Sequence, residues 1–317
     1  MTAAVTVVGE ALIDLVGDRA QSGRFDTRTG GSPLNVATTA ARLGVDVELV
    51  ARVGQDAFGA MLHSRAASAG IGLTHWQTCA EPTSLALANL DDGGRADYVF
   101  YLDGTAALGL DAATLGAIPL GRFLHTGSLA SWHPRSRPAV ESLQARAHGS
   151  GVVVSYDPNA RPSLMPDPWD ARAIVAEGVA LSHLVKASDE DVEYLYPGLA
   201  LEVVAHEWTN LGADLVVITL GGEGAVAYTA AGELARVAAP AVNVVDTVGA
   251  GDAFTGGLLA ALCAQGIETP DALHCADAAA LTRALQRAAL VAAMTCERAG
   301  ADPPVRAEVT ARLGSEF

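Results

Sequence analysis

The strongest constraint on the fold is an alternation of short apolar runs with helical segments, punctuated by glycines. Val5–Val8 is predicted to be a buried strand that ends at Gly9. A helix follows, with Ser32 as the expected N-cap, Pro33 as its first residue and Gly44 as its C-terminal stop. Such a strand–helix alternation is typical of a parallel sheet flanked by helices, and it predicts an α/β fold.

The same alternation continues along most of the chain, with one interruption. A helix is predicted from residue 57 to about 69, and strands at 45–53, 122–126, 152–157, 183–186 and 215–219. A hairpin is expected at 221–239 and another at 83–102, around the acidic glycine turn 91–94. We expect one domain over residues 1–317, with a β-sheet lid formed by about 11–29 and 83–106.

Charge and cysteine usage narrow the classes of function. The 317 residues are 50% apolar and carry a formal net charge of −16, which argues against nucleic acids and anionic membranes as partners. No run approaches the ~20 apolar residues of a membrane span, and the N-terminus does not resemble a signal peptide. The four cysteines have no metal-binding spacing. We therefore expect a cytoplasmic protein with reduced thiols.

The stretch "DTVGAGDAFTGG", residues 246–257, is unusually rich in glycine. Apolar residues at Phe254, Leu258 and Leu262 are spaced by one helical turn, so Gly249–Gly251 should lie at a helix N-terminus. Free N–H groups and the positive end of the helix dipole attract an anion there, and missing side chains let it approach closely.

Asp252 then lies in the first turn of that helix. It could serve only to stabilise the helix dipole, a contribution of about 0.3–1 kcal/mol, but that role leaves the glycines unexplained. An acid beside an anion site is what phosphoryl transfer requires, since the amides stabilise the transferred group and the acid accepts a proton from the attacking hydroxyl. Neither the P-loop pattern nor the dinucleotide-binding glycine pattern is present in the sequence.

Two segments resemble the signatures of the ribokinase-like (PfkB) carbohydrate kinases, namely "GGSPLNVATTAARLG" and "DTVGAGDAFTGG". Between them, "SYDPNARPSL", "VKASDEDVEYLYP" and "FYLDGTA" most resemble the fructokinase branch, so the resemblance covers nearly the whole chain. It implies a three-layer sandwich with a mostly parallel central sheet and a small β-sheet lid. It also implies ATP-dependent phosphorylation of a sugar hydroxyl with Mg²⁺, and it leaves a K⁺ requirement open.

The resemblance also assigns roles to individual residues. Asp252 would be the catalytic base, and Gly249, Ala250 and Gly251 would form the anion hole. The sugar would be bound by Asp14, Gly30, Gly31, Asn35, Phe100 or Tyr101, and Arg161. Asn35 could instead be an ordinary polar residue of its helix, and Arg161 could form a surface ion pair.

On the nucleotide side, the resemblance assigns ATP to Lys186, Ser188, Thr219, Leu220, Gly221, Gly222 and Gly224. The two adjacent glycines could equally form only a tight hairpin. In the family an Asn-x-x-Glu motif organises the Mg²⁺ water shell, whereas this chain has Ser188 and Asp191 at the matching positions, so Asp191 would act through water. Asp246, Val248 and Gly300 resemble the monovalent-cation loop of the family.

Several alternatives remain open at this point. A 2-keto-3-deoxygluconate kinase would need a cation for the substrate carboxylate, for which Arg161 is the obvious candidate. A nucleoside kinase of the same fold and a sugar- or nucleotide-sensing module without catalysis are the others. We expect fructose as the substrate, and a homodimer through the exposed strand edges of the lid.

Overall fold

The computed structural model describes residues 3–17, 23–90 and 96–317, and within them an eight-stranded sheet forms the centre of the molecule. The order of its strands is β14-β13-β12-β11-β10-β9-β1-β4. Those from β12 to β4 run parallel, and β13 and β14 are antiparallel. Their bounds are β1 Val5–Val8, β4 Val47–Val50, β9 Phe123–Gly127, β10 Val153–Asp157, β11 Leu184–Ser188, β12 Leu215–Thr219, β13 Ala225–Thr229 and β14 Gly232–Val237.

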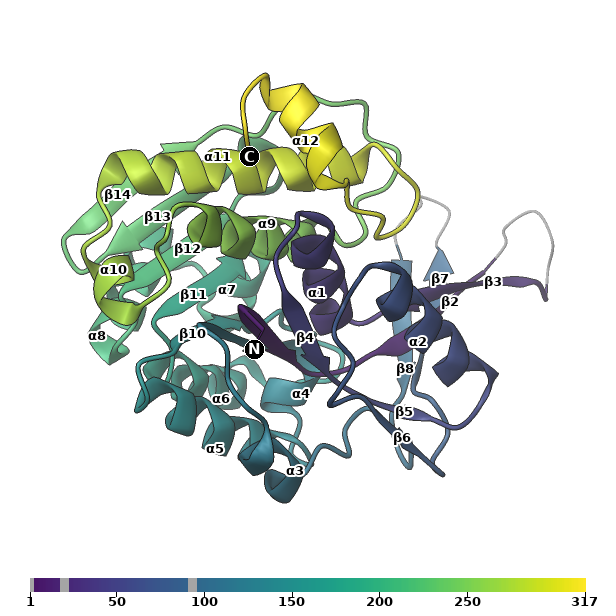
Figure 1. The fold of residues 1–317 in the computed structure, drawn as a ribbon. Helices are drawn as coiled ribbons and strands as arrows, with labels where there is room; N and C mark the ends of the chain where they lie inside the picture. Colours follow the sequence, from purple (N-terminus) through teal and green to yellow (C-terminus); the bar gives the residue numbers. More distant parts are fainter. Residues whose placement is uncertain (1–2, 18–22, 91–95) are drawn as a thin grey trace.

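Helices cover both faces of this sheet (Figure 1). On one face lie α1 (Ser32–Arg42), α9 (Ala250–Ala264) and α11 (Ala278–Cys296), which share a core with Val5 and Val7. On the other, α5 (Arg137–His148) packs with Val8, because successive side chains of a strand point to opposite faces. This face also carries α6 (Pro168–Ala180) and α8 (Leu201–Leu211). The expected three-layer ribokinase-like sandwich is confirmed.

The remaining helices complete the described part of the chain. They are α2 Ala57–Ser68, α3 Ala112–Ala117, α4 Ser128–Trp132, α7 Asp189–Leu195, the 3₁₀ turn η1 Gly221–Glu223, α10 Pro270–His274 and α12 Arg306–Leu313. None of the helices in the described ranges is long and apolar enough to cross a membrane.

A separate four-stranded sheet, here called the small sheet, lies beside the main one (Figure 1). Its strands are β2 (Leu12–Gly17), β3 (Phe25–Gly30), β7 (Leu85–Leu90) and β8 (Ala96–Tyr101), in the order β3-β2-β7-β8. The predicted antiparallel pairing of β7 and β8 is confirmed, while their turn at 91–94 lies outside the described residues. That the chain forms one domain with a lid at 11–29 and 83–106 stays a prediction.

Two local predictions were wrong. Residues 45–53 form β4 and a second strand, β5 (Arg52–Gly54), which leaves the main sheet to pair with β6 (Gln77–Cys79). The N-cap of α1 is Gly31, whose φ of 103° suits glycine, and not Ser32. The Ser32 hydroxyl instead donates a hydrogen bond to Asp252, a residue far away in the sequence.

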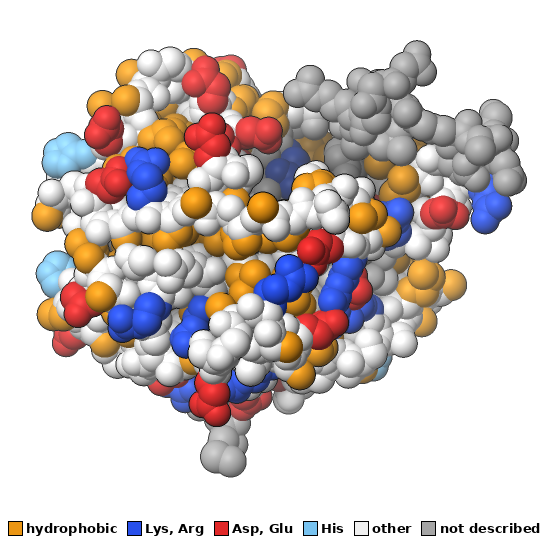
Figure 2. All heavy atoms as spheres, turned by 90° about the horizontal axis from the view of Figure 1, so that it is seen from above, with side chains coloured by type: hydrophobic (Ala, Val, Ile, Leu, Met, Phe, Trp, Pro, Cys, Tyr) orange, Lys and Arg blue, Asp and Glu red, His pale blue; other side chains and the backbone are white. Residues whose placement is uncertain are grey.

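Acidic and basic side chains are interspersed on the face that carries α11 and α12, as Figure 2 shows for its described residues. The cysteines are free thiols. Their exposure ranges from the buried Cys79 to the exposed Cys275, with Cys263 and Cys296 between them.

Candidate active site

The candidate site lies where parallel strands of the main sheet end and α9 begins. The carboxyl ends of β9, β10, β11 and β12 supply Gly127, Asp157, Ser188 and Thr219. The chain passes from β1 to its neighbour β4 on one side and later to β9 on the other, so the strand order reverses direction at β1. Ligands of open α/β sheets bind in the crevice at such a switch point.

Asp252 is held in a fixed orientation in the first turn of α9. Its Oδ1 accepts a hydrogen bond from Ser32 Oγ at 2.6 Å, and its Oδ2 accepts one from Asn35 Nδ2 at 2.8 Å. Gly249 is the N-cap of α9 and has a left-handed backbone, with φ at 76°. The predicted helix start and the place of Asp252 in it are therefore confirmed. Two donors from α1 leave the carboxylate oriented and partly exposed, as a proton acceptor must be.

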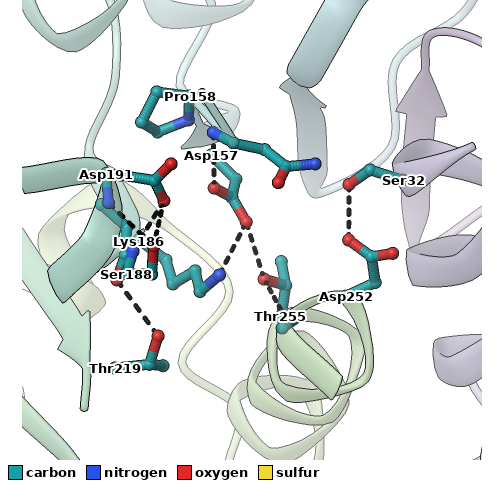
Figure 3. A network of polar contacts seen from close by, with 12 residues as sticks. Ser32, Asp157, Pro158, Lys186, Ser188, Asp191, Thr219, Asp252 and Thr255 are labelled. Atoms are coloured by element: carbon teal, nitrogen blue, oxygen red, sulfur yellow. Dashed lines mark hydrogen bonds and ion pairs between the residues drawn. The ribbon is translucent and has the colours of Figure 1, made fainter. Parts of the chain in front are cut away.

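A buried ion pair lies on the other side of the α9 N-terminus (Figure 3). Lys186 Nζ donates to Asp157 Oδ2 at 3.0 Å, and Thr255 Oγ1 donates to the same oxygen at 3.4 Å. Burial by itself would lower the pKa of Lys186, but the carboxylates around it, led by Asp157, raise that pKa. A Cβ on Gly251 would lie 3.2 Å from Lys186 Nζ, so the ammonium and the bare helix end face the same space.

Asp14 lies on the small sheet, with its side chain against Gly30. A Cβ on Gly30 would collide with Asp14 Oδ2, so the glycine leaves space for this carboxylate. Burial, and secondarily the negative charge of Asp252, raise the pKa of Asp14 to about 6. The positive charges of Arg161 and Arg28 lower the pKa of Asp14, so both arginines lie within electrostatic reach of this carboxylate.

Strand register decides between the two aromatic candidates. Asp14 pairs with Ala86, and Ala86 pairs with Phe100, so Phe100 lies on the Asp14 face of the small sheet. Tyr101 lies on the opposite face and is 54% exposed. Of the two alternatives, the register therefore favours Phe100 as the residue beside Asp14, and a site role for either aromatic residue stays a prediction.

The residues predicted to bind the nucleotide lie along the ends of β11 and β12. Ser188 and Asp191 form a capping box at the start of α7: Asp191 Oδ2 accepts from the amide and hydroxyl of Ser188, and its Oδ1 accepts from the Ala160 amide at 2.7 Å. Thr219 pairs in register with Ser188. Residues 220–224 form a closed turn in which the Leu220 amide donates to the Gly224 carbonyl. The described residues contain no cluster of three or more metal-ligating side chains.

The predicted cation-loop residues meet around one carboxylate. Asp246 Oδ1 accepts from the Val248 amide at 3.0 Å, and Oδ2 accepts from the Gly300 amide at 2.8 Å. Oδ2 also accepts from Arg28 at 3.1 Å. Partial burial would raise the pKa of Asp246, but these three donors together lower it. An arginine of the small sheet therefore reaches the loop that leads into α9.

Sequence reasoning missed several polar groups of the site. Glu10 is fully buried; its Oε2 accepts from the Ala130 amide at 3.2 Å, and burial raises the pKa of Glu10 to about 7. Ser128 and Asn159, which have positive φ of 52° and 40°, hydrogen-bond to each other through their side chains. Such backbone conformations are concentrated at functional sites. Glu10 lies two residues after the end of β1, and this position was the one signal for it in the sequence.

An oriented acid, a helix N-terminus free of side chains and a buried ammonium meet at the carboxyl ends of the parallel strands, and this arrangement suits phosphoryl transfer. Residues 2–308 match the family model "pfkB family carbohydrate kinase". The chain belongs to this family, and it is an ATP-dependent sugar kinase.

Individual relatives agree with this assignment. The chain is 34% identical to a fructokinase of Klebsiella pneumoniae over 86% of its own length and 88% of that protein. A fructokinase of Xylella fastidiosa, solved with bound ATP, superposes with a TM-score of 0.86 at 28% identity, covering 98% of this chain and 99% of the other. The Vibrio cholerae fructokinase, solved with fructose, ADP and calcium, gives 0.84 at 29% identity over 97% of each chain. A double mutant of it was solved with potassium.

Proposed function

We propose that the protein phosphorylates fructose, with Asp252 as the catalytic base. The observation that carries the proposal is the placement of Asp252: Ser32 and Asn35 fix its carboxylate next to the N-terminus of α9. A hydroxyl placed between this carboxylate and the helix end would have its proton acceptor and the anion-binding amides within reach of one another.

Each group then has a defined task in the transfer. Asp252 accepts the proton of the attacking hydroxyl, and the amides of Gly249, Ala250 and Gly251 stabilise negative charge on the transferred group. Lys186 adds a positive point charge on the far side of the same space. ATP supplies the γ-phosphoryl group, and Mg²⁺ neutralises charge on its phosphates. Thr219, Leu220 and the turn glycines Gly221, Gly222 and Gly224 support the nucleotide.

The residues present fit a metal ion that arrives with the nucleotide. Asp191 already accepts three hydrogen bonds and is 7% exposed, so it would hold Mg²⁺ through an intervening water. Ser188 orients Asp191 and so takes part indirectly. Mg²⁺ keeps several waters and is commonly bound by one or two carboxylates together with substrate phosphates, which suits this sparse set of ligands.

The sugar side of the site suits a neutral polyol. Asp14 is an acceptor for hydroxyl groups, and Phe100 lies on the same face of the small sheet. Asn35 on α1, which donates to Asp252, is the third proposed contact of the sugar. The side-chain space of Gly31 is taken by the backbone of residues 10–11, so its bare backbone is required by packing as well. Arg161 Nη1 donates to the backbone carbonyls of Asn159 and Ala160, so part of the hydrogen-bonding capacity of this guanidinium is already used within the chain.

A substrate panel tests the choice of sugar. We expect the kcat/KM for fructose to exceed that for 2-keto-3-deoxygluconate at least about tenfold, because a carboxylate buried without a dedicated cation is costly. Nucleosides should be poorer still. A preference for the ketodeoxy acid that Arg161→Ala abolishes would replace fructose as the substrate. If calorimetry shows that a sugar binds but no ADP is formed from Mg-ATP, the protein would instead be a sensing module without catalysis.

We also propose that the protein is a cytoplasmic homodimer. Its free thiols suit a reducing compartment, where ATP is available. On the small sheet, the face opposite Asp14 exposes Phe25 (44%), Val99 (44%) and Tyr101 (54%). Exposed apolar side chains grouped on one sheet face are typical of protein–protein contacts.

A further inference from the structure

Arg28 connects parts of the molecule that are far apart in the sequence. It lies on β3, directly opposite Asp14 on β2, so both side chains are on the same face of the small sheet. Its guanidinium reaches Asp246, 218 positions further along the chain. Asp246 is three residues before Gly249, the N-cap of the catalytic helix. One cation thus contacts the sugar-side sheet and the loop that enters α9.

The surroundings of Asp246 leave little room for a metal ion. Both carboxylate oxygens accept backbone amides, and Oδ2 also accepts the guanidinium. Gly300 has a φ of 72°, and a Cβ on it would lie 3.2 Å from Arg28 Nη1, so the guanidinium occupies the space beside this glycine. A monovalent cation in the loop would have to displace a charge that the chain itself supplies. The described residues therefore do not fit a potassium ion at Asp246.

We infer that Arg28 is a built-in cation, which takes the place of a monovalent metal ion in the loop of Asp246, Val248 and Gly300. Its positive charge neutralises Asp246 and fixes the loop, so that the amides of Gly249–Gly251 are aimed correctly without a bound ion. Arg28 is a positioning residue, because it acts through Asp246 and does not touch the reacting groups. The Arg28 and Asp246 side chains are 38% and 22% exposed, so their contribution to overall stability should be small.

The inference rests on the kinase activity and predicts its ion dependence. ADP is measured directly, so that no coupling enzyme introduces an ion requirement, with either KCl or tetramethylammonium chloride at equal ionic strength. The wild-type kcat should differ less than about twofold between the salts. Arg28→Ala should lose about tenfold or more in tetramethylammonium and recover to within about threefold of wild type in K⁺. Arg28→Lys should keep most of the activity without K⁺.

Arg24→Ala is the matched control. Arg24 directly precedes β3 and pairs only weakly with Asp26, at 3.8 Å, with both side chains more than half exposed. This variant should behave as wild type in either salt. A second readout does not need catalysis: K⁺ should raise the Tm of Arg28→Ala and leave that of the wild type unchanged, because only the variant has an open cation site.

Three results would overturn the inference. They are strong activation of the wild type by K⁺, an Arg28→Ala variant that is fully active without K⁺, and an Arg28→Ala defect that no monovalent ion restores. The Tm measurement separates this inference from the choice of substrate. If no sugar is phosphorylated, a K⁺-dependent Tm in Arg28→Ala alone still supports the built-in cation, and a K⁺-dependent Tm in the wild type still contradicts it.

Discussion

At the scale of single residues, Asp14 makes the pH dependence of the enzyme predictable. Its pKa is raised to about 6, so the carboxylate takes up a proton as the pH falls through 6 and loses acceptor capacity for sugar hydroxyls. We expect kcat/KM for the sugar to decline on the acidic side with an apparent pKa near that value, and to be level above it. A pH series of initial rates at limiting sugar measures this.

Asp14→Asn separates Asp14 from two other carboxyl groups of the site whose pKa values burial raises, Glu10 (about 7) and Asp157 (about 6). The variant should have a KM for the sugar at least about tenfold higher, a nearly unchanged KM for ATP, and no acidic decline near pH 6. An unchanged decline in Asp14→Asn would assign the titration to Glu10 or another group. A defect confined to ATP would remove Asp14 from the sugar site.

The sequence predicted some residues of the site and not others, for a physical reason. Asp252, Asn35 and Gly249 lie in segments with strong local signals, and the structure brings these segments together. Ser32 and Arg28 contact partners about 220 positions away, and local patterns carry no information on such contacts. Ser32 even gave a misleading local signal, because a serine before a proline at a helix start usually caps the helix.

At the scale of elements, the start of α9 allows a paired test of the anion hole. Gly251 lies in the helix with its side-chain position directed toward Lys186. Gly251→Ala should therefore reduce kcat by at least about tenfold, because the methyl group occupies the space for the transferred phosphoryl group. Its Tm should be unchanged or higher, because alanine favours a helix by up to ~1 kcal/mol over glycine.

Gly249→Ala is the structural counterpart. Gly249 has a φ of 76°, and a Cβ there would lie 2.5 Å from the Cβ of Ala301. The substitution should destabilise the fold by about 1–3 kcal/mol, visible as a lower Tm. If Gly251→Ala lowers Tm as much as Gly249→Ala does, both glycines serve the fold alone.

Periodicity and glycine signals predicted the start and end of α9 and most strands of the main sheet. They failed at 45–53, where one predicted strand contains residues of two strands that belong to different sheets. The chain changes sheet at Ala51, whose carbonyl accepts the Gln77 amide. The side chains of both strands are largely buried, so the hydrophobic pattern shows no break there.

At the scale of the whole molecule, the exposed apolar face of the small sheet predicts a dimer. Light scattering should give about twice the chain mass of 32.4 kDa. Val99→Glu should shift the protein to a monomer, because it places a charge within the proposed contact. Val203→Glu is the control, since Val203 on α8 is 52% exposed and far from the small sheet in the fold. A monomeric wild type, or a dimer that Val99→Glu leaves intact, would contradict this interface.

The strand–helix alternation predicted the layered architecture, and the hairpin pattern predicted the small sheet. The sequence did not predict the position of the small sheet relative to the main sheet. That position depends on packing and on contacts between distant segments, such as the one between Arg28 and Asp246. The mixed order of that sheet, with β2 parallel to β7, also follows from tertiary packing alone.

The most direct test of the account is the turnover of Asp252→Asn with fructose and Mg-ATP. The asparagine at position 252 keeps the size of the side chain, and a rotation of the Asn35 amide can restore the hydrogen bond between the two residues. An amide, however, does not accept the proton of the attacking hydroxyl. We predict a fall in kcat of about 10²–10⁴-fold, with sugar and ATP affinities by calorimetry changed far less. A variant that keeps more than about a tenth of wild-type turnover would show that Asp252 is not the base.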